Sequence, residues 1–193
     1  MLATMEKPQL TAHIPSWAVL LEQFYARSGH PLPSIYPVKD TQVPPPYKAL
    51  LVHSADMTPT LEKFHGQPVG ITVLNRDLQP DFYLREVVLN VSRNGTSEPR
   101  PIEYGVIRIC LNRFPAGARR RVIEEQRPLG AILQAEGIPH ISWPQAFFRL
   151  ESDSRLGGLL RLRQPAELYG RRNVLLDGSR HLLAEVIEIL PPV

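Results

Sequence analysis

The most constraining feature of the sequence is a β-hairpin signal close to its C-terminus. Two strand-like runs, residues 172–176 and 182–190, flank the pair Asp177-Gly178. An Asp-Gly pair between two such runs is a strong signal for a tight turn. Strands joined by tight turns pair antiparallel, whereas parallel strands need long crossover connections. The chain is therefore predicted to build an antiparallel sheet.

Other segments extend this prediction to a fold class. Asn94-Gly95 is a second hairpin signal, and a short helix is expected between Thr58, its cap, and Gly66, which follows its end. Further helical segments lie at 118–126 and between 127 and 137. The remaining strands are expected at 69–74, 82–92, 102–111 and 146–150. We predict an α+β fold, with a single antiparallel sheet of about six strands and short helices packed on it.

The first 47 residues have a different character. Ser16 is placed to cap an amphipathic helix, and residues 31–46 carry six prolines, which exclude a helix or a central strand. The apolar side chains of the helix follow helical spacing (Trp17, Leu20, Leu21 and Phe24). We interpret residues 1–47 as a helix and a proline-rich arm over the surface of a domain at 48–193. Docking of the arm in a partner's groove is the alternative.

Composition excludes several classes of function. The single Cys110 excludes an internal disulfide and a cysteine-built metal site, and the six histidines show no metal-ligand spacing. The 22 basic and 19 acidic residues balance too evenly for a surface that follows nucleic acid phosphates. No apolar run is long enough to span a bilayer, and no phosphate-binding glycine loop is present. We expect a cytoplasmic protein without cofactor or metal.

Two charged residues interrupt apolar strands. Arg85 alternates with Val87 and Leu89, and Glu185 lies between Leu183 and Ile187 on one strand face. Because an isolated buried charge is costly, such residues are usually paired or shared with a ligand. If both enter one cavity, the arginine suits a ligand carboxylate and the glutamate suits acid/base work. Each has an alternative: an exposed arginine on a half-solvated sheet, and a glutamate that pairs with an arginine.

Two further arginines, Arg171 and Arg172, follow Tyr169-Gly170. They would add positive potential at the mouth of such a cavity, although solvated arginines at a strand end are commoner. The run of arginines from Arg119 to Arg121 is typical of the solvated face of a helix.

Taken together, these segments resemble the chorismate pyruvate-lyase family, the 4-hydroxybenzoate synthases. The resemblance covers residues from about 48 to the end, and its motifs occur in the family's order. They are Asp56-Met57-Thr58, Tyr83-Leu84-Arg85-Glu86-Val87-Val88-Leu89, Pro128-Leu129-Gly130, and Tyr169-Gly170-Arg171-Arg172 followed by Asp177-Gly178 and Leu182-Leu183-Ala184-Glu185.

The resemblance implies an enclosed site under two flaps and a cofactor-independent lyase. Such an enzyme eliminates pyruvate from chorismate and leaves a hydroxybenzoate, most simply 4-hydroxybenzoate for ubiquinone biosynthesis. By this likeness Arg85 binds a carboxylate and Glu185 is the acid/base residue. The backbone amides of Met57 and Leu129 would hold the ligand, and Arg171 or Arg172 would share its second carboxylate. The partner is then a small aromatic-precursor carboxylate, and we expect a monomer that binds neither nucleic acid nor membrane.

Three alternatives remain open from the sequence. A slip of three residues in the alignment exchanges Glu185 for Glu188, and the step of seven residues from Gly178 favours Glu185. A non-catalytic small-anion-binding domain of the ligand-sensing type has the same kind of fold, as in one group of bacterial transcription regulators. A structural or adaptor domain that uses its proline arm is the third.

Overall fold

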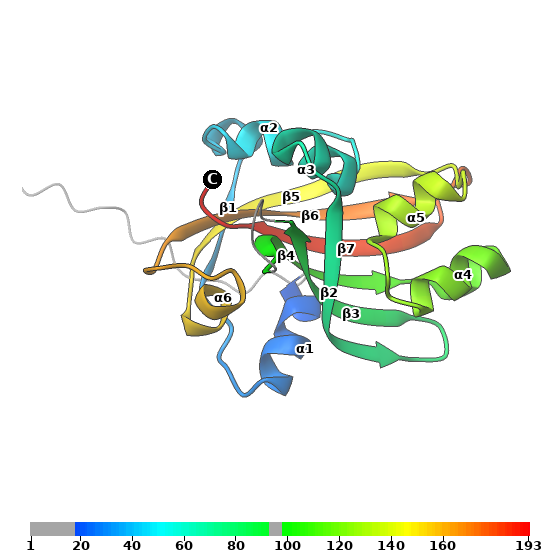
Figure 1. The fold of residues 1–193 in the computed structure, drawn as a ribbon, viewed down its shortest axis with the longest axis horizontal. Coiled ribbons are helices and arrows are strands. Elements are labelled where there is room, and N and C mark those ends of the chain that lie inside the picture. Colours follow the sequence, from blue (N-terminus) through cyan, green and yellow to red (C-terminus); the bar gives the residue numbers. More distant parts are fainter. Residues whose placement is uncertain (1–17, 93–97) are drawn as a thin grey trace, which may run out of the picture.

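The computed structural model describes residues 18–92 and 98–193. Among these residues, seven strands form one antiparallel sheet in the order β1-β5-β6-β7-β4-β3-β2 (Figure 1). The expected cap at Ser16 and the expected turn at Asn94-Gly95 lie outside the described residues. The strands are β1 (Ile35–Val38), β2 (Val69–Leu78), β3 (Tyr83–Val91), β4 (Arg100–Ile109), β5 (Ile141–Glu151), β6 (Glu167–Leu176) and β7 (Leu182–Leu190).

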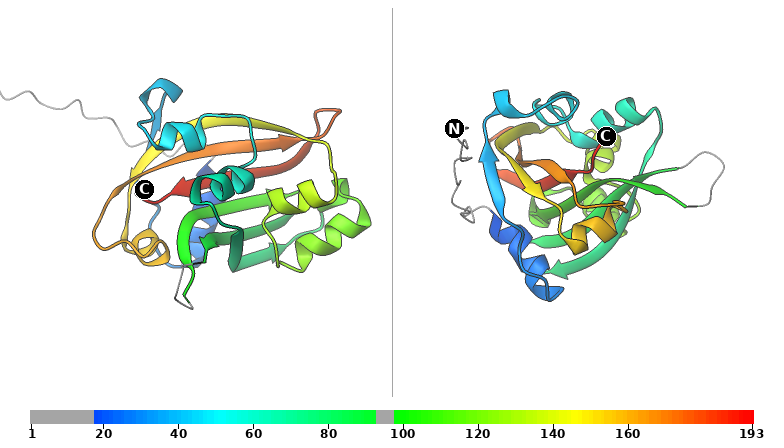
Figure 2. Two further views of the ribbon diagram at one scale, coloured as in Figure 1. Left: turned by 45° about the horizontal axis from the view of Figure 1, so that its top comes forward. Right: turned by 90° about the vertical axis from the view of Figure 1, so that its left-hand side faces the viewer.

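Helices cover both faces of this sheet, as the views of Figure 2 show. The first face packs α1 (Val19–Arg27) and α6 (Ser154–Leu159) against a large apolar cluster. The second face carries α2 (Tyr47–Leu51), α3 (Met57–His65), α4 (Ala116–Ile123) and α5 (Leu129–Ala135) over two further clusters. Short 3-10 turns lie at Asp40–Gln42 and Leu111–Arg113. The α+β prediction, with short helices on a single antiparallel sheet, is confirmed.

The C-terminal hairpin forms where it was predicted. Leu176 pairs with Leu182 across the turn, and Asp177 Oδ1 accepts hydrogen bonds from the amides of Ser179 and His181, both at 2.9 Å. This side-chain bonding is the reason why aspartate favours such turns. The strand pair β6–β7 that results supplies two of the five strands that lie between the sheet's edges.

The described part of the N-terminal segment, residues 18–47, packs on the sheet through α1 and β1. In α1, Leu21, Phe24 and Tyr25 are buried against residues of the first sheet face, among them Leu84. Strand β1 pairs with β5 at the sheet edge and adds the strand that the sequence did not predict. In the described residues, α1 and β1 thus contribute to the same sheet and core as the residues after 47. A strand with a proline is tolerated here because β1 is an edge strand.

Coverage of both faces buries strand β3 along its whole length. All nine residues of β3 are buried, including Arg85 and Glu86, which point to opposite faces. Glu86 on the first face accepts hydrogen bonds from Tyr104 (2.5 Å) and Asn75 (2.6 Å), and it pairs with Arg155 at 2.5 Å. Arg85 points to the second face, where the candidate site lies. In the described part of the chain, no helix is long and apolar enough to cross a membrane.

Candidate ligand-binding site

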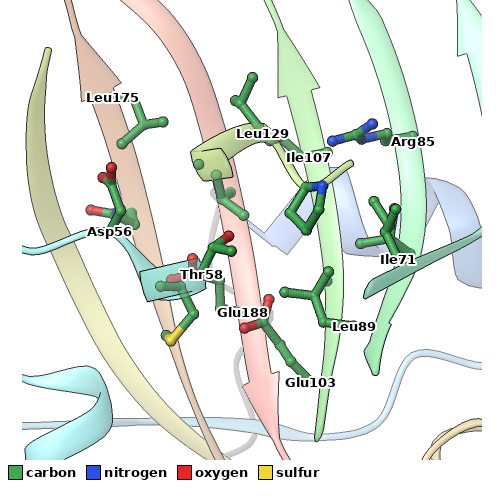
Figure 3. A pocket seen from close by; sticks show the side chains of 17 residues that line it. Asp56, Thr58, Ile71, Arg85, Leu89, Glu103, Ile107, Leu129, Leu175 and Glu188 are labelled. Atoms are coloured by element: carbon green, nitrogen blue, oxygen red, sulfur yellow. The ribbon is translucent and has the colours of Figure 1, made fainter. Parts of the chain in front are cut away.

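A buried cavity lies between the second face of the sheet and the first turns of α3 and α5 (Figure 3). Its volume is about 60 Å³. Strands β3, β4, β6 and β7 form the floor, and the two helix starts form the roof. Most side chains that line it are apolar, including Ile71, Leu89, Ile107, Leu175 and Val186. Apolar walls with a few converging polar groups are typical of small-molecule sites.

A glycine in the middle of the floor leaves room for this cavity. Gly105 of β4 lies opposite Val87 of β3 and Glu188 of β7 in the sheet register. A Cβ atom at this position would lie 3.3 Å from both Glu103 Oε1 and Val87 Cγ2. Glycine inside a strand often marks a site where a ligand approaches the backbone. This signal is readable in the sequence, and the sequence analysis did not use it.

Arg85 supplies the cavity's unpaired positive charge. Its side chain is buried, with 1% exposure, and its Nε and Nη1 atoms have no hydrogen-bond partner among the described residues. Burial lowers the pKa of the guanidinium to about 10, and the nearby Tyr83 and Glu125 oppose this shift. Arg85 therefore stays a cation at neutral pH. Donors that are buried without a partner are costly, so this guanidinium is poised to bind an anionic group.

Glu188 enters the cavity from β7 and pairs with Arg171 of β6. Arg171 is fully buried and also donates to the carbonyl oxygens of Leu51 (3.2 Å) and His53 (3.0 Å). These carbonyls belong to the segment that leads into α3. Arg171 is thus bound to its surroundings and braces one side of the roof, which differs from the free cation that was expected at the cavity mouth.

Two polar residues of the lining escaped the sequence analysis. Glu103 Oε2 and Asn173 Oδ1 are buried and have no hydrogen-bond partner in the described residues. The amide nitrogen of Asn173 donates a hydrogen bond to Ser142 Oγ at 2.9 Å, and its Oδ1 atom remains available as an acceptor. Both residues are polar interruptions of apolar strands, the same signal that identified Arg85. Three residues of one cavity thus offer unused polar atoms.

The roof places the expected flap residues over the cavity. Met57 and Leu129 are the first residues of α3 and α5, and both line the cavity. Amides in the first turn of a helix have no partner within that helix. Neither Asp56 nor Pro128, the residues before the two helices, forms a side-chain cap in the described structure. The contact that joins the flaps is tight, because a Cβ on Gly130 would lie 3.0 Å from Thr58 Oγ1.

The structure does not bring Glu185 and Arg85 together. Glu185 faces the first side of the sheet, where its carboxylate binds Arg108 at 2.5 Å and Arg172 at 2.7 Å. It lines a separate surface groove together with both arginines. The expectation that Arg85 and Glu185 share one cavity is corrected: Glu188 is the glutamate of β7 that enters it. Arg172 likewise lies away from the cavity.

The chain was compared with known proteins. No protein-family model and no curated protein matches the sequence. Its fold resembles that of the possible transcriptional regulator YydK from Bacillus subtilis subsp. subtilis str. 168, with a TM-score of 0.50 and 12% identity. That match covers 72% of this chain and 62% of YydK, less than two thirds of its length.

Two further matches are with PhnF from Mycobacterium smegmatis. Its effector domain has a TM-score of 0.50 and 16% identity, over 72% of this chain and 90% of that domain. A second PhnF structure has a TM-score of 0.50 and 13% identity, over 89% of this chain and 93% of that chain. These matches establish the fold, which is the chorismate lyase-like fold of such effector domains.

The expectation that this chain is an enzyme, a chorismate pyruvate-lyase, is wrong. The finding that overturns it is that the solved structures named above are described as a possible transcriptional regulator and as an effector domain. The geometry agrees, since the expected acid/base residue Glu185 is bound between two arginines on the opposite face of the sheet. The resemblance to the lyases therefore holds for the fold.

Proposed function

We propose that this chain is a ligand-sensing type of domain that binds a small organic anion in the cavity under α3 and α5. The observation that carries the proposal is the buried, cationic guanidinium of Arg85, whose Nε and Nη1 atoms have no hydrogen-bond partner among the described residues. A planar guanidinium offers two parallel donors to a carboxylate. A bound carboxylate would satisfy the donors and neutralise the buried charge.

The walls favour a ligand with an apolar body. Ile71, Val87 and Leu89 flank Arg85 on one side, and Leu129 closes the cavity from the roof. The small volume of about 60 Å³ favours a compact molecule. Amides in the first turn of α3, at Met57 and Thr58, would add donors to an anionic ligand.

The test is a binding measurement with two arginine variants. Wild-type protein, Arg85→Gln and Arg172→Gln are each titrated with benzoate and with pentanoate, and melting is followed by calorimetry. A ligand at 100 times its Kd stabilises a protein by about 2.7 kcal/mol. For a chain of this size, each kcal/mol raises Tm by about 2–4 °C. We expect this rise in the wild type and in Arg172→Gln, and none in Arg85→Gln.

Arg172→Gln is the matched control, because Arg172 occupies the next position to a roof-bracing arginine but faces the other side of the sheet. If both variants lost the stabilisation by ligand, the effect would not be specific to Arg85, and the anion would not be bound in the proposed cavity. Equal stabilisation of the wild type and Arg85→Gln would contradict the proposal directly.

A further inference from the structure

Two glutamates of the cavity lie close to each other and have different partners. Glu103 is two residues from Gly105 on β4, and Gly105 pairs with Glu188 on β7. Such diagonal neighbours on one sheet face are about 7–8 Å apart. Glu188 is paired with Arg171, whereas Glu103 Oε2 has no partner in the part of the chain that is described.

This arrangement decides which of the two carboxyl groups carries a proton. Two buried carboxylates side by side cannot both stay ionised at low cost. Glu188 is paired with Arg171, whereas Glu103 Oε2 has no partner among the described residues, so the neutral form is favoured at Glu103. Burial raises the pKa of Glu103 well above its usual range, the Glu188 carboxylate adds to this effect, and Arg171 opposes it.

The other charged side chains around the cavity are held in ion pairs, with the exception of Arg85. Glu188 is paired with Arg171, and Asp56 Oδ2 lies 2.9 Å from His140 Nε2. Burial lowers the pKa of His140, but its hydrogen bonds to Ile138 and Asp56 and the Asp56 charge raise it overall. Arg85 is the cation of the described lining that has no ion pair. Arg85 is therefore the lining cation that can pair with one negative charge of a ligand, and the Glu125 carboxylate near it is already paired with Arg76.

Arg85 and Glu103 lie at different ends of the floor. In the register of β3 and β4, Arg85 lies opposite Ile107, and Leu89 lies opposite Glu103. Four residues along a strand correspond to about 13 Å. Gly105, which has no side chain, lies between these two ends. Figure 3 shows Arg85 and Glu103 at separate positions around the same space.

We infer that the site selects a monoanion that carries an uncharged hydrogen-bond acceptor away from its anionic group. Arg85 binds the anionic group, and the neutral carboxylic acid of Glu103 donates its proton in a hydrogen bond to the acceptor. Dianions are rejected, because a second charge would meet a neutral acid beside an already paired glutamate. This inference rests on the proposed function and names the class of ligand.

The experiment uses two matched triplets of probes. Within a triplet the carboxylate and the carbon skeleton stay alike, and the group at the far end is apolar, an uncharged acceptor or a second carboxylate. The triplets are benzoate, 4-hydroxybenzoate and terephthalate, and pentanoate, 4-oxopentanoate and glutarate. Affinities are measured by isothermal titration calorimetry on the wild type, Glu103→Gln and Glu103→Leu. In at least one triplet we expect the acceptor-bearing monoanion to bind about tenfold tighter than the apolar monoanion. We expect the dianion to bind at least about tenfold more weakly than the acceptor-bearing monoanion.

The two variants separate the role of the neutral acid from its volume. Glu103→Gln keeps an uncharged donor and should keep the preference for the acceptor. Glu103→Leu removes the donor and should abolish the preference, while the apolar monoanion still binds. An infrared spectrum of the ligand-free protein at neutral pH should contain a protonated carboxylic acid band that is absent from Glu103→Gln.

Each other outcome has a definite meaning. If monoanions bind through Arg85 but Glu103→Leu keeps the preference, or if dianions bind best, the inference fails and the proposed function stands. An infrared spectrum in which Glu103 is ionised also overturns the inference. If no probe of either triplet binds the wild type, the proposed function and the inference fail together.

Discussion

Gly170 precedes the arginine that braces the cavity roof, and its backbone passes close to the neighbouring strands. A Cβ at Gly170 would lie 2.5 Å from both Phe148 Cζ and the carbonyl oxygen of Glu188. Phe148 is fully buried in the cluster of the first face, so its ring has little freedom to move. The glycine of the Tyr169-Gly170-Arg171-Arg172 motif is therefore needed for packing, independently of any ligand.

We predict that Gly170→Ala lowers the free energy of unfolding by about 1–3 kcal/mol, because it forces an additional carbon into a filled space. Gly70→Ala is the matched control. Gly70 also lies within a strand, β2, but its Cβ would meet only Asn90 O at an ordinary 3.8 Å. Urea unfolding of both variants measures the difference, and an equal stability of the two would contradict the packing argument.

Single residues also show how much of the site could be predicted from the sequence. Arg85 was identified because a charge in an apolar strand needs a partner. The choice of Glu185 over Glu188 failed because side chains alternate, so a shift of three residues exchanges the faces of a strand. The register of β6 and β7 is irregular between Leu175 and Leu176, directly beside the turn. Such an irregularity changes which residues share a face, and counting from Gly178 cannot detect it.

At the scale of elements, an ion pair joins the start of α3 to the loop between α5 and β5. Asp56 immediately precedes α3, and His140 follows α5 and its loop. His140 Nε2 lies 2.9 Å from Asp56 Oδ2, and both side chains are largely buried. Burial lowers the pKa of His140, but its hydrogen bonds to Ile138 and Asp56 and the Asp56 charge outweigh burial and raise it.

This raised pKa predicts a pH-dependent stability. The contribution of the pair is fully present below the unfolded pKa of histidine, about 6.5, and is lost as the pH rises through the higher folded pKa. We expect the unfolding free energy of the wild type to exceed that of His140→Gln most at low pH, and the difference to shrink with rising pH. Denaturant unfolding from pH 5.5 to 8.5 measures it.

The comparison with His140→Gln removes the effects of other histidines. Burial, together with Arg171 for His53 and Arg100 for His65, lowers the pKa of each. These two residues therefore contribute a pH dependence of the opposite sign, which is present in both proteins and cancels. A difference that is constant over the range, or that grows with pH, would rule out the charged pair.

The elements themselves were largely predictable, and their ends less so. The helix between Thr58 and Gly66 begins one residue before Thr58, at Met57, and ends at the expected glycine with φ of 65°. Glycine marks helix ends reliably because it adopts the left-handed conformation at little cost. Strand β1 was missed because it is only four residues long and contains Pro37. Its pairing with β5 depends on tertiary structure rather than on a local pattern.

For the whole molecule, the described part of the N-terminal segment supplies an edge strand, β1, and a covering helix, α1, to the one sheet. The sheet has one helical layer on each face, and α1 with α6 makes up the layer on the first face. Without α1, the apolar side chains of the first face around Leu84, Val88 and Tyr104 would lose part of their cover. The proline-rich composition of residues 31–46 concealed this role, because it reports local conformation and not what the flanking helix covers.

A single substitution in α1 tests this role. Phe24 is 1% exposed in the cluster of the first face, and Phe→Ala changes at such sites cost about 3–5 kcal/mol, through lost burial and the cavity left behind. We therefore predict that Phe24→Ala destabilises the whole domain in one cooperative transition. Val19→Ala in the same helix is the control, because Val19 is 48% exposed and surface changes stay within about 0.5 kcal/mol. If α1 were a loosely attached arm, both variants would unfold at the urea concentration of the wild type, since the sheet would keep its stability without the helix.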